Sequence, residues 1–434
     1  MAHRQLGDHR PGQSDGDRRR AHGSPPLSCR RHREEARVSP LRSGRKPDGC
    51  GQEQPDRDPR CTRNGPVDPQ HLGTGNSGRR SGRVRPEVSR LFAPAASALR
   101  PVVLWGLAGA SLLVLSIVFG ITVGETPLPL SRVLAVLANN LWNAGHAVDP
   151  IDAGIIWSYR VPRTLVAAAC GAGLALSGVV LQAIVRNPLA DPYLLGVSAG
   201  AGTGAVAVTI LGLGSGLVGM SAGAFAGASL SFLLVVLLAR AAGGGSPQLV
   251  LAGIAGSQLF NALTSFLITK SANAEQARGI TYWLLGNLSG IRWPDVSLAI
   301  PAALAGLVAC LWFARALDAF SFGASSAASL GIAVRRVQVI LIGATTLMTA
   351  TMVSLVGSIG FVGLVIPHAM RFMVGPRHYR LVPAAALAGA VFLIAADVTS
   401  RVLIPSQVVP IGVVTALVGA PGFALILIRN RRRA

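Results

Sequence analysis

Ten apolar runs follow one another between residues 102 and 428, and most of the polar segments between them are short. A helix needs about 20 residues to cross the roughly 30 Å apolar core of a bilayer, and only the eighth run is clearly shorter. The pattern predicts an all-α polytopic membrane protein with about ten transmembrane helices in a compact bundle. The predicted spans are 102–122, 164–185, 193–213, 217–239, 248–269, 296–316, 337–357, 360–374, 381–403 and 408–428.

Two connections are long enough to hold further helices, 123–162 and 270–295. In the first, apolar residues fall on one helical face beside Trp142, as in a helix that lies on the membrane surface. Within the spans, glycines recur at every fourth position, a spacing that lets helix backbones approach closely in lipid. These stripes predict packing seams and carry no function by themselves. They comprise Gly196, Gly200 and Gly204, and Gly219, Gly223 and Gly227.

Composition divides the chain into a polar tail and a membrane body. Of its 434 residues 50% are hydrophobic and 14% are charged, well below the roughly 25% charged that is usual for soluble domains. Residues 1–99 are rich in Arg, Pro, Gly and Ser, and they lack the apolar surface that offsets ordering entropy. We expect a disordered, basic cytoplasmic tail at 1–99 and a transmembrane domain at 100–434. The alternative is that the tail lies upstream of the true start of the protein.

The Lys and Arg residues outside the tail predict the orientation. Cytoplasmic segments of membrane proteins carry more of these residues than outer segments do. With ten spans and both termini in the cytoplasm, the inner segments hold about 12 of them and the outer segments about 7. We therefore expect a multi-pass protein of the plasma (inner) membrane with cytoplasmic N- and C-termini.

Few residues carry recognisable chemistry. Neither of the two lysines, Lys46 and Lys270, follows a glycine, so a phosphate-binding loop of the P-loop type is missing. No metal-ligand spacing is present, and Cys170 and Cys310 lie in apolar runs, where cysteine packs as a small hydrophobe. Asp397 is the one acid well inside an apolar span. Arg401 stands one turn further on, which favours an internal pair and leaves a functional role open.

Four segments of the body resemble the FecCD/BtuC-type permease family, the membrane subunits of ATP-binding-cassette (ABC) importers for iron-siderophores, haem and cobalamin. The resemblance covers about residues 101–430. The segments are RVPRTL followed by GAGLALSGVVLQAIVRNPLADPYLLGVSAGAG, then GFVGLVIPHAMRFMVG (360–375) and PIGVVTALVGAPGFALIL (410–427).

The resemblance implies a mechanism with several partners. A second permease subunit, the same or paralogous, completes a translocation path, and two ABC ATPase subunits dock on the cytoplasmic side. An extracytoplasmic binding protein delivers the cargo. The chain itself is then no enzyme and needs no cofactor or metal, because ATP and Mg²⁺ belong to the ATPase partner. Membrane lipid surrounds the bundle, and no nucleic acid is expected.

The family places outward-facing arginines, which receive acidic residues of the binding protein, at the positions of Arg160, Arg163 and Arg401. A planar guanidinium suits bidentate pairing with a carboxylate across an interface. The other interpretation is that Arg160 and Arg163 are anchors whose charged ends reach the membrane interface.

At the cytoplasmic end, the resemblance assigns Asn187 and Leu189 to an inner gate between the second and third spans. Prolines 188 and 192 stop helix propagation there, and a plain hairpin would look the same. A second gate element is expected near Ser246, within GGGSPQ.

The loop 317–336 matches the segment that contacts the ATPase, although an ordinary amphipathic loop is the alternative. Family members often carry an acid just after the first glycine, where this chain has Ala324, Ser325 and Ser326. His368, after Pro367, is interpreted as a polar contact at a helix end rather than as a substrate ligand. The residues expected in the coupling loop are Gly323, Ala327, Leu330, Gly331, Arg335 and Arg336.

The predicted function is that of an importer permease which moves a ferric-siderophore type chelate inward. Haem and cobalamin are the alternative cargoes, and the choice between a homodimer and a heterodimer stays open. Two other classes of protein remain: an ion-coupled secondary transporter, and a membrane scaffold or sensor in which the tail is the working part.

Overall fold

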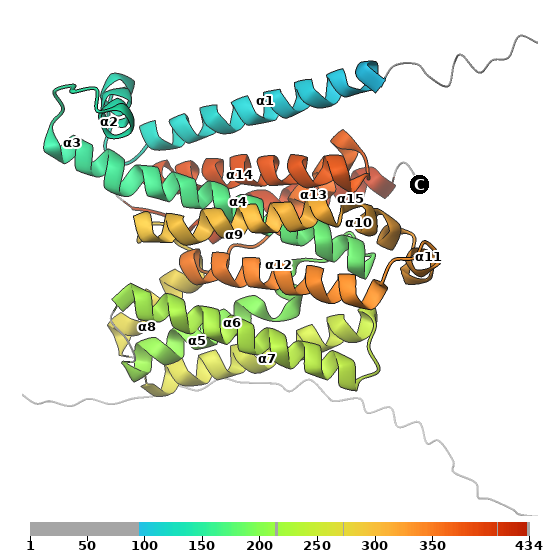
Figure 1. The fold of residues 1–434 in the computed structure, drawn as a ribbon. Helices are drawn as coiled ribbons and strands as arrows, with labels where there is room; N and C mark the ends of the chain where they lie inside the picture. Colours follow the sequence, from blue (N-terminus) through green and yellow to red (C-terminus); the bar gives the residue numbers. More distant parts are fainter. Residues whose placement is uncertain (1–94, 213–215, 272, 406, 432–434) are drawn as a thin grey trace, which may run out of the picture. The chain divides into compact units, whose positions relative to one another are not determined.

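The computed structural model describes residues 95–431 apart from 213–215, 272 and 406, so residues 1–94 of the tail predicted at 1–99 lie outside the described residues. Within the described ranges every regular element is a helix, and an isolated bridge joins Ile404 and Gln407. The all-α prediction is therefore confirmed (Figure 1).

All ten predicted spans correspond to helices. Among the described residues, six helices are long and apolar enough to cross a bilayer, and four shorter apolar helices account for the other spans. The predicted short eighth span is the 13-residue α13. The ten helices are α1 (Ala95–Thr122), α4 (Val161–Val185), α5 (Val197–Leu211), α6 (Gly216–Ala241), α7 (Ser246–Ser271), α9 (Trp293–Trp312), α12 (Val334–Val356), α13 (Val362–Val374), α14 (His378–Val402) and α15 (Ile411–Arg431).

Short helices fill the longer connections, as the sequence predicts. Val133 and Val136 of α2 are buried, whereas Leu130, Leu134 and Trp142 of the same helix are exposed. The helical connections are α2 (Leu130–Trp142), α3 (Pro150–Gly154), the π-helix η2 (Ile155–Arg160), the 3₁₀-helix η3 (Pro192–Leu195), α8 (Ala274–Leu284), α10 (Ala314–Ser321) and α11 (Ala324–Ser329).

Helix α4 forms the centre of the main core. It packs against α14, α9, α12 and α13, and 89% of its most apolar stretch is buried. Two glycines permit this packing. A Cβ atom on Gly171 would lie 2.1 Å from the carbonyl oxygen of Gly389 in α14, and one on Gly178 would lie 1.9 Å from that of Gly363 in α13. The backbones of α4 and α14 are therefore in direct contact.

The predicted glycine seam joins α5 and α6. A Cβ atom on Gly204 would lie 2.0 Å from the carbonyl oxygen of Gly223, and one on Gly200 would lie 2.4 Å from that of Gly227. Backbone contact at these four positions confirms the stripes as packing surfaces.

Helix α4 also defines the two ends of the bundle used below. Arg160, immediately before α4, marks the arginine end, where α2 and α3 lie. The loop that follows α4 marks the opposite end, together with α10 and α11 (Figure 1).

Candidate functional site

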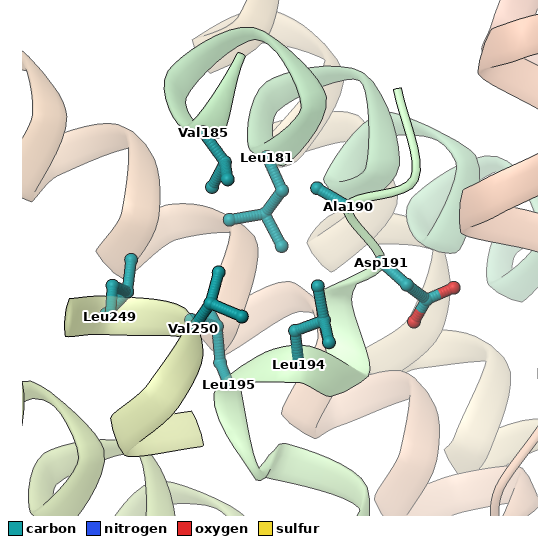
Figure 2. Close-up of a pocket in the computed structure, with 8 residues that line it drawn as sticks. All are labelled: Leu181, Val185, Ala190, Asp191, Leu194, Leu195, Leu249 and Val250. Atoms are coloured by element: carbon teal, nitrogen blue, oxygen red, sulfur yellow. The ribbon is translucent and has the colours of Figure 1, made fainter. Parts of the chain in front are cut away.

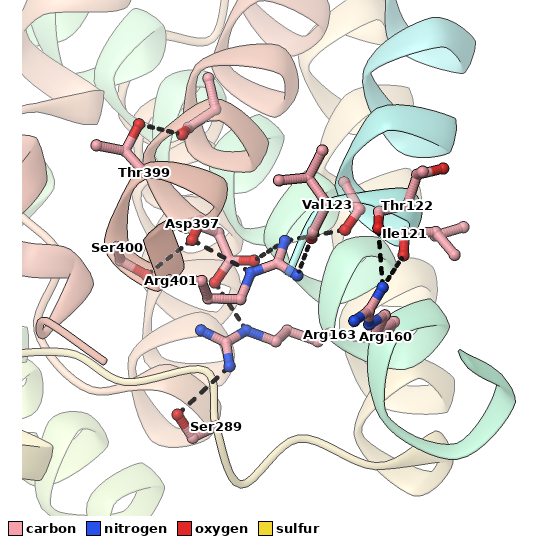
Figure 3. A network of polar contacts seen from close by, with 12 residues as sticks. Ile121, Thr122, Val123, Arg160, Arg163, Ser289, Asp397, Thr399, Ser400 and Arg401 are labelled. Carbon is pink, nitrogen blue, oxygen red and sulfur yellow. Dashed lines mark hydrogen bonds and ion pairs between the residues drawn. The ribbon is translucent and has the colours of Figure 1, made fainter. Parts of the chain in front are cut away.

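Asp397 links two arginines at the arginine end (Figure 3). Its Oδ1 accepts a hydrogen bond of 2.8 Å from Nε of Arg163, which lies 234 residues away in the sequence. Its Oδ2 lies 3.0 Å from Nη2 of Arg401, an ion pair without the geometry of a directed hydrogen bond. The predicted Asp397–Arg401 pair is therefore present, and Arg163 extends it. Two guanidinium groups share one buried carboxylate.

Arg401 and Arg160 also bind the C-terminal end of α1 and the residues that follow it. Arg401 donates to the carbonyl oxygens of Val123 (2.7 Å) and Gly120 (2.9 Å). Arg160 donates to those of Ile121, Thr122 and Thr126. The last carbonyls of a helix have no partner within the helix and carry partial negative charge. Both arginines therefore cap α1 and fix it to α4 and α14.

This geometry distinguishes the three arginines that the sequence groups together. Arg160 and Arg401 are only 6% and 5% exposed, so neither presents the outward-facing side chain that docking requires. Arg163 differs, because its side chain is 12% exposed and its second partner is the Ser289 hydroxyl at 3.4 Å. These arginines lie far in the sequence from the carbonyl oxygens that they cap at the end of α1. The sequence pattern therefore did not predict this capping.

At the opposite end, α4 stops at a tight turn. Arg186 adopts a left-handed backbone (φ 55°), and Oδ1 of Asn187 accepts a hydrogen bond of 2.9 Å from the Leu189 amide. Leu189 is 44% exposed. The two predicted gate residues therefore lie in one short turn that protrudes from the bundle.

The second predicted gate segment lies beside the chain that follows this turn. Ser246 begins α7, which packs against η3, and a Cβ atom on Gly253 would lie 1.7 Å from the Leu194 carbonyl oxygen. A small apolar pocket separates the segments (Figure 2). Its lining combines Leu181, Val185, Ala190, Asp191, Leu194 and Leu195 with Leu249 and Val250 of α7.

Asp191 holds the start of η3. Its Oδ1 accepts a hydrogen bond of 2.8 Å from the Tyr193 amide, and the Tyr193 hydroxyl donates to the Ile359 carbonyl at 2.9 Å. Burial raises the pKa of the Asp191 carboxyl to about 6, and the hydrogen bond from Tyr193 opposes part of that rise. The segment after the gate turn is thus fixed to the loop between α12 and α13.

The predicted coupling loop folds into α10 and α11. Gly323 (φ 113°) and Gly331 (φ 80°) have backbones that side chains rarely tolerate, and they bracket α11. A Cβ atom on Gly323 would lie 3.3 Å from Nη1 of Arg186, so this loop adjoins the gate turn. Ala327 is fully buried.

In contrast to the buried Ala327, other residues of the coupling loop expose apolar and basic side chains. Leu330 is 72% exposed, and Arg335 and Arg336 are exposed as well. Phe322 is 81% exposed, and the sequence analysis did not single it out. The sequence feature that could have pointed to Phe322 is its position directly before Gly323, the first residue expected in the coupling loop. Exposed apolar groups beside cations suit an interface with another protein.

The structure corrects the interpretation of His368 as a polar contact at a helix end. The residue lies inside α13, is buried, and has no hydrogen-bond partner on either ring nitrogen among the described residues. Its ring packs edge-on against Phe372 and Phe423, with centroids 5.2 and 6.5 Å away. Cys170 and Cys310 are buried in the main core, as predicted.

Comparisons with known proteins agree with this architecture. A model of the FecCD transport family matches residues 112–429. The cobalamin import permease BtuC of Halobacterium salinarum is 38% identical and aligns with 76% of this chain and 96% of its own. The Fe(3+) dicitrate permease FecD of Escherichia coli is 36% identical, with 75% and 96% aligned. A solved structure, described as an inward-facing metal-chelate type ABC transporter, matches with a TM-score of 0.66 and 31% identity over 75% of this chain and 98% of that chain.

The ten apolar helices and these relatives define a multi-pass membrane protein of the permease class. The chain belongs to the FecCD transport family and is the permease subunit of an ABC importer rather than an enzyme.

Proposed function

We propose that the subunit moves a ferric-siderophore type chelate inward across the plasma membrane, with the arginine end outside and both termini in the cytoplasm. The observation that carries the proposal is the contrast between the ends of one bundle. At one end two guanidinium groups share the Asp397 carboxylate, and at the other Phe322 and Leu330 are exposed beside two arginines. The first suits an acidic partner and the second a partner with an apolar pocket.

The support for the cargo comes from relatives that are named for two different substrates. The Escherichia coli relative is named for Fe(3+) dicitrate, which supports a ferric chelate. The relatives named for cobalamin support the second candidate, a cobalamin importer. Haem is a further alternative.

Uptake of labelled ferric siderophore, haem and cobalamin by a deletion strain carrying the gene decides between the cargoes. We expect ATP-dependent uptake of the ferric chelate alone. Uptake that ends when the ion gradient is collapsed, with ATP maintained, would instead indicate a secondary transporter.

For docking, we propose that Arg163 is the arginine that reaches a carboxylate of an extracytoplasmic binding protein. Its side chain is partly exposed whereas Arg160 and Arg401 are buried, and it shares the Asp397 carboxylate with Arg401. A partner carboxylate would supply the second negative charge. Arg160 and Arg401 support this contact indirectly by holding the end of α1.

The docking proposal is tested by titrating the purified permease with the binding protein. We expect Arg163→Ala to lower the affinity about thirtyfold or more, since loss of one partner of a buried charge pair costs about 2 kcal/mol or more. The matched control is Arg132→Ala, an exposed arginine of the same end that pairs with Asp152 at 2.6 Å. Equal affinities for the two variants would exclude Arg163 as the docking residue.

For energy coupling, we propose that residues 317–336 contact one of two ABC ATPase subunits, which bind ATP and Mg²⁺, and that a second permease subunit completes the path. The closeness of Gly323 to Arg186 supports a link between the gate and the ATPase.

Asn187, Leu189 and Ser246 would form the gate at the cytoplasmic end of the translocation path. Labelling of a Leu189→Cys variant, with and without ATP, tests the gate: reactivity that is unchanged by ATP would argue against it.

A further inference from the structure

Asp318 of α10 binds the first residue of α14. Its Oδ1 accepts a hydrogen bond of 2.8 Å from the His378 amide and lies 2.7 Å from Nδ1 of the His378 ring. The His378 side chain is 2% exposed and that of Asp318 is 39% exposed. The contact therefore sits at the edge of the bundle, with the histidine inside.

The carboxylate acts as a helix cap supplied from another element. The first amides of a helix lack partners within the helix, and a negative charge is favourable there. Arg377, the residue at the cap position of α14, provides no side-chain hydrogen bond. In the described part of the chain, the hydrogen bonds that join α10 and α11 to a long helix are the two that Asp318 makes with His378 of α14. The remaining support is apolar, from buried residues such as Leu317 and Phe320.

The same helix carries the ion pairs of the arginine end. Asp397 and Arg401 lie on α14, 19 residues and more beyond His378, a distance of about 28 Å along a helix axis. Between these points Gly389 is in backbone contact with Gly171 of α4. Helix α14 therefore connects the ion pairs of Asp397 to the Asp318–His378 contact beside the coupling loop. Its packing against α4 stiffens α14 between these two points.

We propose that Asp318 is a positioning residue for energy coupling: it fixes the ATPase-facing α10–α11 segment to α14, so that the two ends of the bundle move together. This inference rests on the proposed function of the coupling loop. It assigns Asp318 no contact with cargo or nucleotide.

A local measurement tests the attachment in the purified full-length permease, before any ATPase is added and without reference to cargo. A spin label is placed at the exposed position 330 (Leu330→Cys) in a chain whose five native cysteines are replaced by alanine. We expect Asp318→Ala to increase label mobility, whereas Asp318→Asn, which keeps the acceptor oxygen, leaves it unchanged. The control is Arg380→Ala, an exposed residue of the same turn. Equal mobility in Asp318→Ala and the parent would overturn the inference.

A functional measurement follows in proteoliposomes, using the one of three labelled probes (ferric siderophore, haem or cyanocobalamin) that the unaltered complex takes up. We expect Asp318→Ala to lower the cargo moved per ATP hydrolysed about fivefold or more, with ATPase binding retained. Asp318→Asn restores the ratio, and His378→Leu, which keeps the backbone bond alone, gives an intermediate value.

The two measurements distinguish a failure of the proposed function from a failure of the inference about Asp318. If the unaltered complex takes up none of the probes, the proposed function fails while the mobility result still decides on Asp318. If that complex transports and Asp318→Ala matches it, the inference is wrong and the proposed function stands. If Asp318→Ala does not assemble, the order Asp318→Asn above His378→Leu is required; equal coupling in these two variants would overturn the inference.

Discussion

The two ends of the bundle satisfy their polar groups in opposite ways. At the arginine end, three arginines bond to carbonyl oxygens and to one carboxylate, and two of them are almost fully buried. At the opposite end, Leu189, Phe322 and Leu330 protrude, and glycines with positive φ shape the loop. The comparison separates residues that hold the fold together from residues that remain available to a partner. We expect substitutions at the arginine end to change stability and those at the opposite end to change association.

The largest effect should come from separating the helices that connect the two ends. In Gly171→Ala the new Cβ would lie 2.1 Å from the Gly389 carbonyl oxygen, so α4 and α14 must move apart. We expect a loss of about 4 kcal/mol in the free energy of unfolding in detergent. The control is Gly343→Ala in α12, where no atom lies within 4 Å of the added Cβ. Similar losses in both variants would refute the close contact of α4 and α14.

The next effect concerns the buried carboxylate. Asp397→Ala leaves Arg163 and Arg401 without their shared counter-ion, and we expect a loss of about 3 kcal/mol in the free energy of unfolding. Asp152→Ala breaks the exposed pair with Arg132 at the same end and should cost less than about 1 kcal/mol. If the two losses were equal, the arginine cluster would not be the stabilising element we describe.

A smaller effect depends on pH and lies near the gate. The pKa of Asp191 rises from 3.8 to about 6 on folding, so between these values the folded state binds more protons than the unfolded state. Stability therefore falls as the pH rises from about 4 to 6 and is then constant, with a total change of up to about 3 kcal/mol from this group. Asp191→Asn keeps the bond to Tyr193 and should remove that fall, so that the variant is more stable than the parent at pH 7.

Denaturation measured across this pH range provides the test. The matched control is Asp149→Asn, an exposed aspartate whose side chain accepts an equivalent hydrogen bond of 2.8 Å from the Ile151 amide. Its profile should follow the parent. A parent profile that rises between pH 4 and 6, with the same rise lost in Asp191→Asn, would reverse our assignment for Asp191.

The smallest effect on stability is expected at Leu330. Because its side chain is exposed, Leu330→Ser should change the free energy of unfolding by less than about 0.5 kcal/mol. Its affinity for the ATPase subunit, measured by titration, should fall about fivefold or more, as for an apolar interface residue. Ser329→Ala, whose lost hydroxyl binds only Ser326 of the same helix, is the control. A destabilised Leu330→Ser variant with full affinity would contradict the division between the two ends.

Local patterns in the sequence predicted most of the fold. Hydropathy located all ten apolar helices, because each long helix must present an apolar surface along its length. Glycine spacing predicted the α5–α6 seam, and the Asp397–Arg401 pair followed from a separation of one helical turn. Each of these signals lies within one helix or between neighbours in sequence.

The contacts that the sequence did not predict join distant segments. Arg163 meets Asp397 across 234 residues, and Asp318 meets His378 across 60. The capping of α1 by Arg160 and Arg401 depends on where α1 ends relative to α4 and α14. Hydropathy fixes the length of helices and leaves their mutual rotation undetermined. Arg160, Arg163 and Arg401 could therefore be named as candidates, but their partners in distant segments could not, and Asp318 and His378 were not singled out.

The caps on α1 have a consequence for biogenesis. The Gly120 carbonyl receives its bond from Arg401, which leaves the ribosome 281 residues later. At synthesis rates of about 5–20 residues per second, this interval lasts roughly 15 to 60 seconds. Arg160, only 39 residues beyond Ile121, is available much earlier. The first helix of the bundle is therefore secured in two stages during insertion, and its final fastening waits for the penultimate long helix to enter the membrane.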